Sequence, residues 1–267
     1  MRSPRPARPE RPREPELAED AHIRDLSKDA RGRLRGLSKD NAERVGAHLV
    51  MVGRLLDDDP ELAYEHAQAA VRRAGRIDIV REAAGLAAYR TGRYAEALRE
   101  LRTVRRLNGS SEHLPLMADA ERGLGRPERA VALGQSAEVE TLDADARTEL
   151  AIVVSGARSD LGEHEAALTV LDRIPASQQR GDQGLRVLQA RAVALEAAGR
   201  AQEAADLLAG VDAAALARAT GAADADEDVV VFDTFDEDAT DDDDEDGVGE
   251  APTGPAPDSG SRAEGTA

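Results

Sequence analysis

The sequence predicts an all-α fold, a solenoid of about five stacked helix-turn-helix units. Three observations predict it. One alanine recurs at steps of 34, 33, 37 and 37 residues, at Ala63, Ala97, Ala130, Ala167 and Ala204. In the last four units a glycine lies five residues before that alanine, at Gly92, Gly125, Gly162 and Gly199. Aromatic residues make up only 2% of the chain, so the core has to be built from Leu, Ala and Val in thin helix pairs that pack against their neighbours.

The first helix of each unit is predicted from apolar residues at helical spacing upstream of the glycine, as at Val80, Ala84 and Ala88. The turn glycine is expected to end this helix, because glycine adopts the left-handed conformation of a helix C-terminus at little steric cost. Small residues that would let two helices approach closely lie seven positions before each glycine: Gly85, Ala118, Ser155 and Ala192.

The second helix of each unit is expected to begin soon after the glycine, with an acidic residue near its positive N-terminal end. These acidic residues are Glu96, Glu128, Glu165 and Glu203. The first unit departs from the pattern, because Asp59 and Pro60 occupy its turn. Further upstream, the segment 38–43 offers a capping residue, with Glu43 three positions past Asp40, and predicts another helix start.

The spacing of Gly85, Tyr89, Gly92, Tyr94 and Ala97 resembles that of the tetratricopeptide repeat (TPR) family. The other units keep the glycine and the alanine but replace the aromatic residues, and the resemblance covers roughly residues 40–218. It implies a right-handed superhelical solenoid whose first helices line a concave face that binds extended segments. Residues 38–102 also look like a group of actinobacterial TPR proteins of unassigned activity.

Two terminal segments differ in composition from the repeats. We expect a disordered Arg/Pro-rich arm over residues 1–22, a TPR-like domain over 23–221 and a disordered acidic tail over 222–267. Residues 224–264 hold 17 acidic residues and one arginine, which accounts for most of the net charge of −18. The apolar residues within this run, Val231, Phe232 and Phe235, are typical of a segment that docks on a partner or on basic repeats. A purely solubilising tail is the alternative.

The sequence contains none of the common catalytic motifs. No GxxxxGK[ST], HExxH or GxSxG segment occurs, and no cysteine is present to form disulfides or thiolate metal sites. The five histidines form no i, i+4 pair, so packing or surface roles are expected for them. We therefore expect a non-catalytic protein with no cofactor and no bound metal.

A cytoplasmic location is expected, with no membrane partner. No apolar run approaches the ~18 residues that a membrane span requires. The arginine- and proline-rich start also lacks the apolar stretch of a signal peptide.

The favoured function is a protein–protein scaffold or adaptor that binds a peptide or a partner protein in the concave groove, with the acidic tail tuning access. Counting from the turn glycines, the groove should include His48, Glu82, Leu86, Tyr89, Arg90, Asp119, Arg122 and Ser159. Tyrosine and arginine are enriched at binding hot spots. Some family members hold a partner's C-terminal carboxylate with a Lys/Asn clamp on this face. Glu82 and Leu86 stand at two of those places, so no such clamp is expected here.

The alternative function is a nucleic-acid-associated protein. Residues 72–106 contain ten arginines and four acidic residues, and Arg99, Arg102, Arg105 and Arg106 would form the basic surface. The near absence of aromatic residues for base stacking and the strongly negative net charge disfavour this alternative. A third interpretation is that the arginines form a solvated, ion-paired helix face, for example through Glu96–Arg99 and Asp78–Arg81.

Overall fold

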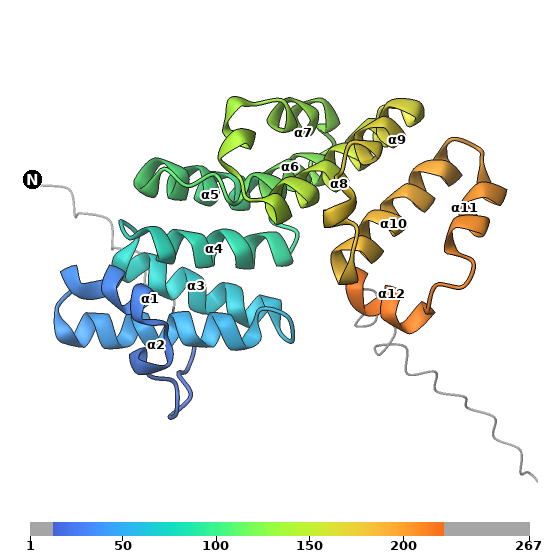
Figure 1. Cartoon of the computed structure of the whole chain (residues 1–267). Helices are drawn as coiled ribbons and strands as arrows, with labels where there is room; N and C mark the ends of the chain where they lie inside the picture. Colours follow the sequence, from blue (N-terminus) through green and yellow to red (C-terminus); the bar gives the residue numbers. More distant parts are fainter. Residues whose placement is uncertain (1–12, 222–267) are drawn as a thin grey trace, which may run out of the picture. The chain divides into compact units, whose positions relative to one another are not determined.

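The computed structural model describes residues 13–221, and within this range the regular structure is entirely helical (Figure 1). Ten helices form five antiparallel pairs along the chain, which confirms the predicted number of units. The pairs are α2 (Lys39–Leu55) with α3 (Pro60–Ala74), α4 (Asp78–Arg90) with α5 (Tyr94–Asn108), α6 (Leu114–Gly123) with α7 (Pro127–Gly134), α8 (Ala144–Asp160) with α9 (His164–Asp172), and α10 (Gly181–Ala197) with α11 (Ala201–Leu208).

Shorter helices flank and connect these pairs. The remaining elements are η1 (Ile23–Asp25), α1 (Lys28–Arg33), η2 (Leu34–Gly36), η3 (Ala137–Thr141), η4 (Ala176–Gln178) and α12 (Ala213–Thr220). Leu34 of η2 is fully buried against Val45 and Val80, so this segment covers the end of the first repeat. At the other end α12 packs on α10. None of the described helices combines the length and the apolar character that crossing a membrane requires.

The predicted glycine turns are confirmed in four units. Gly92, Gly125, Gly162 and Gly199 have φ values of 69°, 69°, 76° and 76°, in the left-handed region that side chains with a Cβ adopt at a steric cost. In the second unit the Gly92 amide donates to Tyr89 O at 3.0 Å and the Arg93 amide donates to Ala88 O at 2.7 Å. This pair of bonds is a Schellman motif, which satisfies the last carbonyls of the helix.

In the first unit the turn between the two helices contains an aspartate and a proline in place of the glycine. The Asp59 side chain accepts a hydrogen bond from the Leu62 amide at 3.0 Å, and Pro60 occupies the first position of α3. A capping carboxylate followed by proline is a strong helix start, because it satisfies an amide that the helix leaves free and sets the first φ. A helix does start within the segment 38–43, since α2 begins at Lys39, but the Ser38 side chain makes no capping hydrogen bond.

Each recurring alanine is the fourth residue of the second helix of its unit, and each is fully buried at 0% exposure. The small residues of the first helices lie opposite these contacts. At Gly85 an added Cβ would come within 2.7 Å of Leu101 Cδ2, so glycine is required for the α4–α5 distance. Ala118, Ser155 and Ala192 are also buried. The recurring small residues therefore mark the positions where the helices of a unit approach each other most closely.

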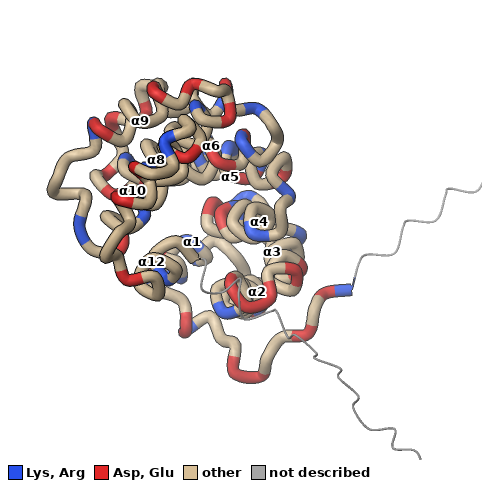
Figure 2. Tube along the Cα trace, turned by 90° about the vertical axis from the view of Figure 1, so that its right-hand side faces the viewer, with Lys and Arg blue, Asp and Glu red and all other residues tan. Residues whose placement is uncertain are grey.

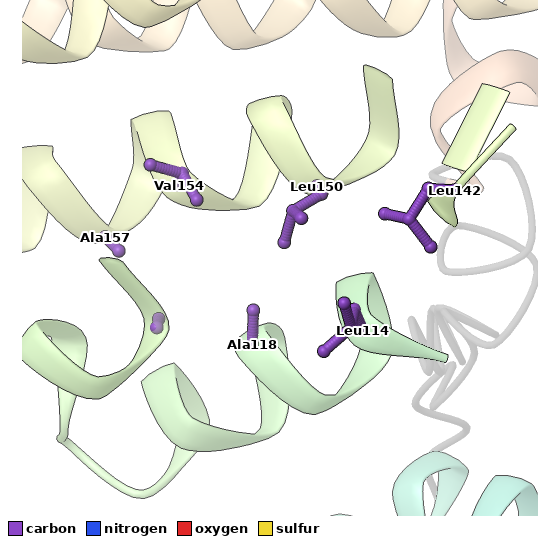
Figure 3. Close-up of a cluster of buried hydrophobic side chains, with 7 residues drawn as sticks. Leu114, Ala118, Leu142, Leu150, Val154 and Ala157 are labelled. Atoms are coloured by element: carbon purple, nitrogen blue, oxygen red, sulfur yellow. The ribbon is translucent and has the colours of Figure 1, made fainter. Parts of the chain in front are cut away.

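The hydrophobic core is distributed along the stack rather than gathered in one place. In Figure 3, Leu150 of α8 points toward Leu114 and Ala118 of α6, and Val154 and Ala157 of α8 belong to the same cluster. Leu142, from the segment that leads into α8, closes one end of this cluster. Similar clusters join α2 to α4 and α10 to α9 and α11. Each unit thus buries its apolar face against its neighbours, as expected of a repeat array.

The N-terminal boundary differs from the expected one. Residues 13–22, assigned from sequence to a disordered arm, pack on α2 and α3: Glu14 accepts a hydrogen bond from Arg73 at 2.7 Å and Ala21 is 5% exposed. The ordered part therefore begins before residue 23, because Glu14 and Asp20 pair with arginines of α3 and α2 and Ala21 packs on α2. Residues 1–12 and the acidic segment 222–267, with Val231, Phe232 and Phe235, lie outside the described residues.

Gly85→Ala should destabilise the protein by about 1–3 kcal/mol, because the new methyl group overpacks the α4–α5 contact. Gly53→Ala is the matched control, since Gly53 also lies within a helix but has no atom within 4 Å of an added Cβ. The control should be neutral or stabilising by up to ~1 kcal/mol, from helix propensity. Urea unfolding of both variants measures the difference, and equal stabilities would contradict the close contact.

Candidate functional site

Four polar side chains join three successive first helices, α4, α6 and α8. The Tyr89 hydroxyl of α4 donates to Asp119 Oδ2 of α6 at 2.5 Å. Arg122, one turn along α6, donates to Asp119 Oδ1 at 3.0 Å and to Asp160 Oδ2 of α8 at 2.8 Å. Burial, followed by the hydrogen bond to Asp119, raises the pKa of Tyr89, so this hydroxyl stays protonated and remains a donor. The structure thus brings together three of the residues predicted for the groove.

Glycine on the neighbouring helix makes room for Arg122. A Cβ added at Gly156 of α8 would lie 2.8 Å from Arg122 Cζ, so the guanidinium lies directly over the α8 backbone. With two carboxylate partners and this packing, Arg122 fastens one repeat to the next. All three of its guanidinium nitrogens donate to carboxylates within the molecule, so a partner that bound Arg122 would compete with these contacts.

His48 is the predicted groove residue that the structure corrects. It is 1% exposed and lies between α2 and α3, where its Nδ1 is 2.9 Å from Nδ1 of His66, which is also buried. Glu14 covers it from the N-terminal segment, with Oε2 3.9 Å from His48 Nε2. The first unit has no turn glycine, so counting from the glycine pattern had no reference point there and placed His48 on the wrong face.

The remaining predicted groove residues make local contacts. Arg90 is exposed and pairs with Asp57 at 2.8 Å, at the turn of the first unit. Leu86 is half-buried, and the Ser159 hydroxyl is buried with no hydrogen-bond partner among the described residues. Glu82 lies beside His113 of the next unit, with a Glu82 Oε1 to His113 Nε2 distance of 3.4 Å. These residues lie on α4 and near the end of α8. They do not form one continuous patch of hydrogen-bond donors available to a partner.

The arginines predicted as a basic surface are largely ion-paired within the molecule. Arg99 pairs with Glu96 and Glu100, Arg102 with Glu121, and Arg105 with Glu138. The pairing expected between Glu96 and Arg99 is confirmed at 3.2 Å. The one expected between Asp78 and Arg81 is wrong, because Asp78 pairs with Arg33 and Arg81 pairs with Glu100. Arg106 donates to the Thr103 hydroxyl at 3.4 Å.

Two of these arginine clusters neutralise buried carboxylates. Glu100 is 3% exposed and is held by Arg81 at 2.6 Å, and Glu121 is 2% exposed and is held by Arg102 at 2.7 Å. A buried carboxylate requires such partners, because leaving it unpaired would cost several kcal/mol. Figure 2 shows basic and acidic positions interspersed on the same helices. This ion pairing argues against a surface dedicated to nucleic acid.

A cleft that the sequence analysis did not identify lies over α8. It has a volume of about 540 Å³ and is bordered by the end of α7, by η3, by the end of α9 and by η4. Its floor is one stripe of α8 that includes Ala144, Thr148, Ala151 and Val154. Three arginines surround this apolar floor, at Arg147, Arg158 and Arg173.

The cleft exists because the second helices on either side of α8 are short. α8 has 17 residues, whereas α7 has 8 and α9 has 9. At 1.5 Å per residue the difference leaves ~12 Å of α8 without a full-length helix beside it. Pro175 follows the end of α9, and Gly134 ends α7 against Val154 of α8, where an added Cβ would lie 2.4 Å from Val154 Cγ2. Helix length, rather than any motif, is the sequence signal that could have revealed this site.

Two of the cleft arginines lack carboxylate partners among residues 13–221. Arg147 donates to the backbone oxygen of Leu142 at 2.9 Å, and neither Arg147 nor Arg173 forms an ion pair within this range. Arg158 differs, because it pairs with Glu163 at 2.6 Å. The cleft thus combines an apolar floor with two arginines, Arg147 and Arg173, that form no ion pair within residues 13–221.

Two solved structures are similar to this chain in fold. A crystal structure described as a Podosopora anserina kinesin light chain with nearly identical TPR-like repeats has 19% identity and a TM-score of 0.50, covering 70% of this chain and 99% of that one. A single-substitution variant of it has 21% identity and a TM-score of 0.52, covering 67% of this chain and 97% of that one. The likeness confirms a TPR-like helical repeat fold. No family model and no curated protein matches the chain, and the likeness to actinobacterial proteins stays a prediction.

Tyr89→Phe should lower the free energy of unfolding by about 1–3 kcal/mol, because it leaves the part-buried Asp119 oxygen without its donor. Tyr94→Phe is the matched control, since the Tyr94 hydroxyl makes no hydrogen bond within residues 13–221 and its ring packs near that of Tyr89. The control should change stability by less than ~0.5 kcal/mol. A loss of similar size in both variants would contradict the assignment, because removal of a hydroxyl without a hydrogen bond would then cost as much as removal of the one bound to Asp119.

Stability should fall as the pH drops from about 6.5 to about 4, because burial, and then the neighbouring His66, lower the pKa of His48 from 6.5 to about 4. Between these values the unfolded chain binds the proton and the folded chain does not, so acid favours unfolding. The effect is on the order of 3 kcal/mol at full extent.

Urea unfolding at several pH values tests this dependence. His48→Gln should flatten the curve relative to wild type. His164→Gln should leave it unchanged, because His164 lies outside the pair. An unchanged pH dependence in His48→Gln would contradict the assignment.

Proposed function

We propose that this protein is a non-catalytic repeat scaffold that binds an apolar, acidic segment of a partner protein in the cleft over α8. The observation that carries the proposal is the cleft itself, which combines about 540 Å³ of open volume, an apolar floor and two arginines, Arg147 and Arg173, that form no ion pair within residues 13–221. Repeat arrays use extended surfaces of this kind to bind other proteins. No motif in the sequence predicts turnover, so binding is the function proposed.

The residues that line the cleft indicate what kind of segment would bind there. Ala144, Ala151 and Val154 offer small, flat contacts that suit the side chains of a single inserted segment. Arg147 and Arg173 lie on the border and would pair with carboxylates that flank those side chains. A basic segment would be repelled by the same arginines, and specificity needs such a repulsive element as well as an attractive one.

The groove predicted from sequence is a competing location for the same function. Tyr89, Asp119 and Arg122 already satisfy one another, so a partner there would have to break existing hydrogen bonds. Leu86 and Arg90 remain accessible enough to contribute. The cleft is favoured because Arg147 and Arg173 form no ion pair within residues 13–221, although Arg158 pairs with Glu163.

We also propose that the acidic segment 222–267 regulates how readily a partner binds in the cleft. Its carboxylates and apolar residues have the chemistry that the cleft would accept, so it would compete with a partner. Removing this segment should then increase the affinity of the cleft for its partner. An unchanged affinity would show that the segment does not compete, and only the repeat domain would then take part in binding.

The proposal is tested by selecting binders for the full-length chain from a displayed random-peptide library. We expect the enriched peptides to carry apolar residues flanked by Asp or Glu. Fluorescence polarisation of one enriched peptide then compares wild type with Arg147→Glu/Arg173→Glu. This variant should weaken binding at least ~10-fold, because reversing two rim charges replaces attraction with repulsion.

Leu86→Ala/Arg90→Glu is the matched control for the other face, with the same number of substitutions. It should bind as wild type does. If this variant loses the peptide and the cleft variant does not, the binding face is the groove predicted from sequence. Enrichment of basic peptides would contradict the proposed partner chemistry.

A further inference from the structure

Three potential metal ligands come together between the second and third repeats. Glu82 lies on α4, and Glu112 and His113 lie in the turn that leads into α6. One ligand atom from each residue lies within 4.8 Å of the other two. The His113 Nε2 atom is 3.4 Å from Glu82 Oε1 and 3.6 Å from Glu112 Oε1.

The His113 side chain has a ring nitrogen without a hydrogen-bond partner among the described residues. Nε2 is buried and makes no hydrogen bond within residues 13–221, although it faces two carboxylates. Both distances exceed the 2.7–3.2 Å range of an N–H···O hydrogen bond. Buried polar atoms without partners are uncommon, and an ion is one of the explanations for them.

The turn that carries two of the ligands is held in place before any ion binds. The Glu112 amide donates to the Ser110 hydroxyl at 3.2 Å, and the Leu114 amide donates to Ser111 O at 2.9 Å. Leu114 is fully buried and anchors the start of α6. Asn108 also ties the turn to α4, by donating to Asp78 Oδ2 at 3.3 Å. A site with fixed ligands loses little freedom when it binds its ligand.

The two distances from His113 Nε2, 3.4 Å to Glu82 and 3.6 Å to Glu112, are close to those between neighbouring ligands of a tetrahedral ion. Zinc binds histidine nitrogen at 2.0–2.1 Å and carboxylate oxygen at 2.0–2.2 Å, which places neighbouring ligand atoms of a tetrahedron roughly 3.3–3.5 Å apart. The octahedral ligands of magnesium, at 2.0–2.1 Å, would be closer, roughly 2.9 Å apart. An imidazole ligand also favours zinc over calcium or magnesium, which prefer oxygen.

We propose that Glu82, Glu112 and His113 bind one divalent transition-metal ion, with zinc the best fit. Two carboxylates and a neutral imidazole match the charge of such an ion. Three protein ligands leave a fourth position for water or for an atom of a bound molecule. The ion would join α4 to α6 and stabilise the contact between two repeats. This proposal differs from the expectation of no metal and is independent of the cleft.

The test uses the full-length chain and cobalt(II) as the probe, because tetrahedral cobalt absorbs visible light strongly and cobalt bound loosely to exposed carboxylates does not. Wild type should show one saturable equivalent of tetrahedral absorption, and added zinc should displace it. Glu82→Gln and His113→Gln should each weaken cobalt binding at least ~10-fold, since each removes one of three ligands.

Glu128→Gln and His164→Gln are the matched controls. They change the same residue types at the starts of other repeat helices, and they should bind cobalt as wild type does. Circular dichroism of each variant checks that α6 remains folded after substitution of His113. The proposal fails if wild type shows only weak, octahedral-type absorption. It also fails if folded Glu82→Gln keeps the full signal, because His113 would then be only an ion-pair partner of the two glutamates.

Discussion

Close approach of helices at small residues is the constraint on which the rest of this structure depends. With aromatic residues at 2% of the chain, no large rings are available to fill wide gaps between helices. Ala97 is fully buried where α5 meets its neighbours, and Gly85 leaves no space for a methyl group. Dispersion contacts weaken steeply with distance, so short helices with small side chains gain stability only by packing this closely. The repeats then have to stack, because no single pair buries enough surface.

Charged residues serve mainly to fasten these thin units together. Arg122 joins α6 to α8, and Arg102 joins α5 to Glu121 of α6. Pairs that include a buried carboxylate cannot be broken without exposing that carboxylate to an apolar environment. The arginine-rich composition of residues 72–106 is therefore explained by packing, and the local excess of positive charge is not evidence for a polyanion partner.

The two candidate binding sites, the cleft and the cluster of metal ligands, lie where the repeat becomes irregular. The cleft forms where α7 and α9 are too short to cover α8 and η3 replaces a regular helix–helix connection. The Glu82–Glu112–His113 cluster lies at the turn from α5 to α6, which is long enough to place two ligands beside α4. Both irregular segments leave groups available to a ligand, an apolar surface in the cleft and the His113 nitrogen in the cluster. Function in this array is thus expected at departures from the pattern.

The sequence by itself determined the helix pairs, the glycine turns and the buried alanines, because helix period and left-handed turns depend on residues within a few positions of one another. It also identified Tyr89, Asp119 and Arg122 as neighbours on one face. The buried contact of His48 with His66 and the cleft over α8 were decided only by the tertiary structure. Both depend on where helices end and how they lie across one another, and that geometry joins residues far apart in the chain.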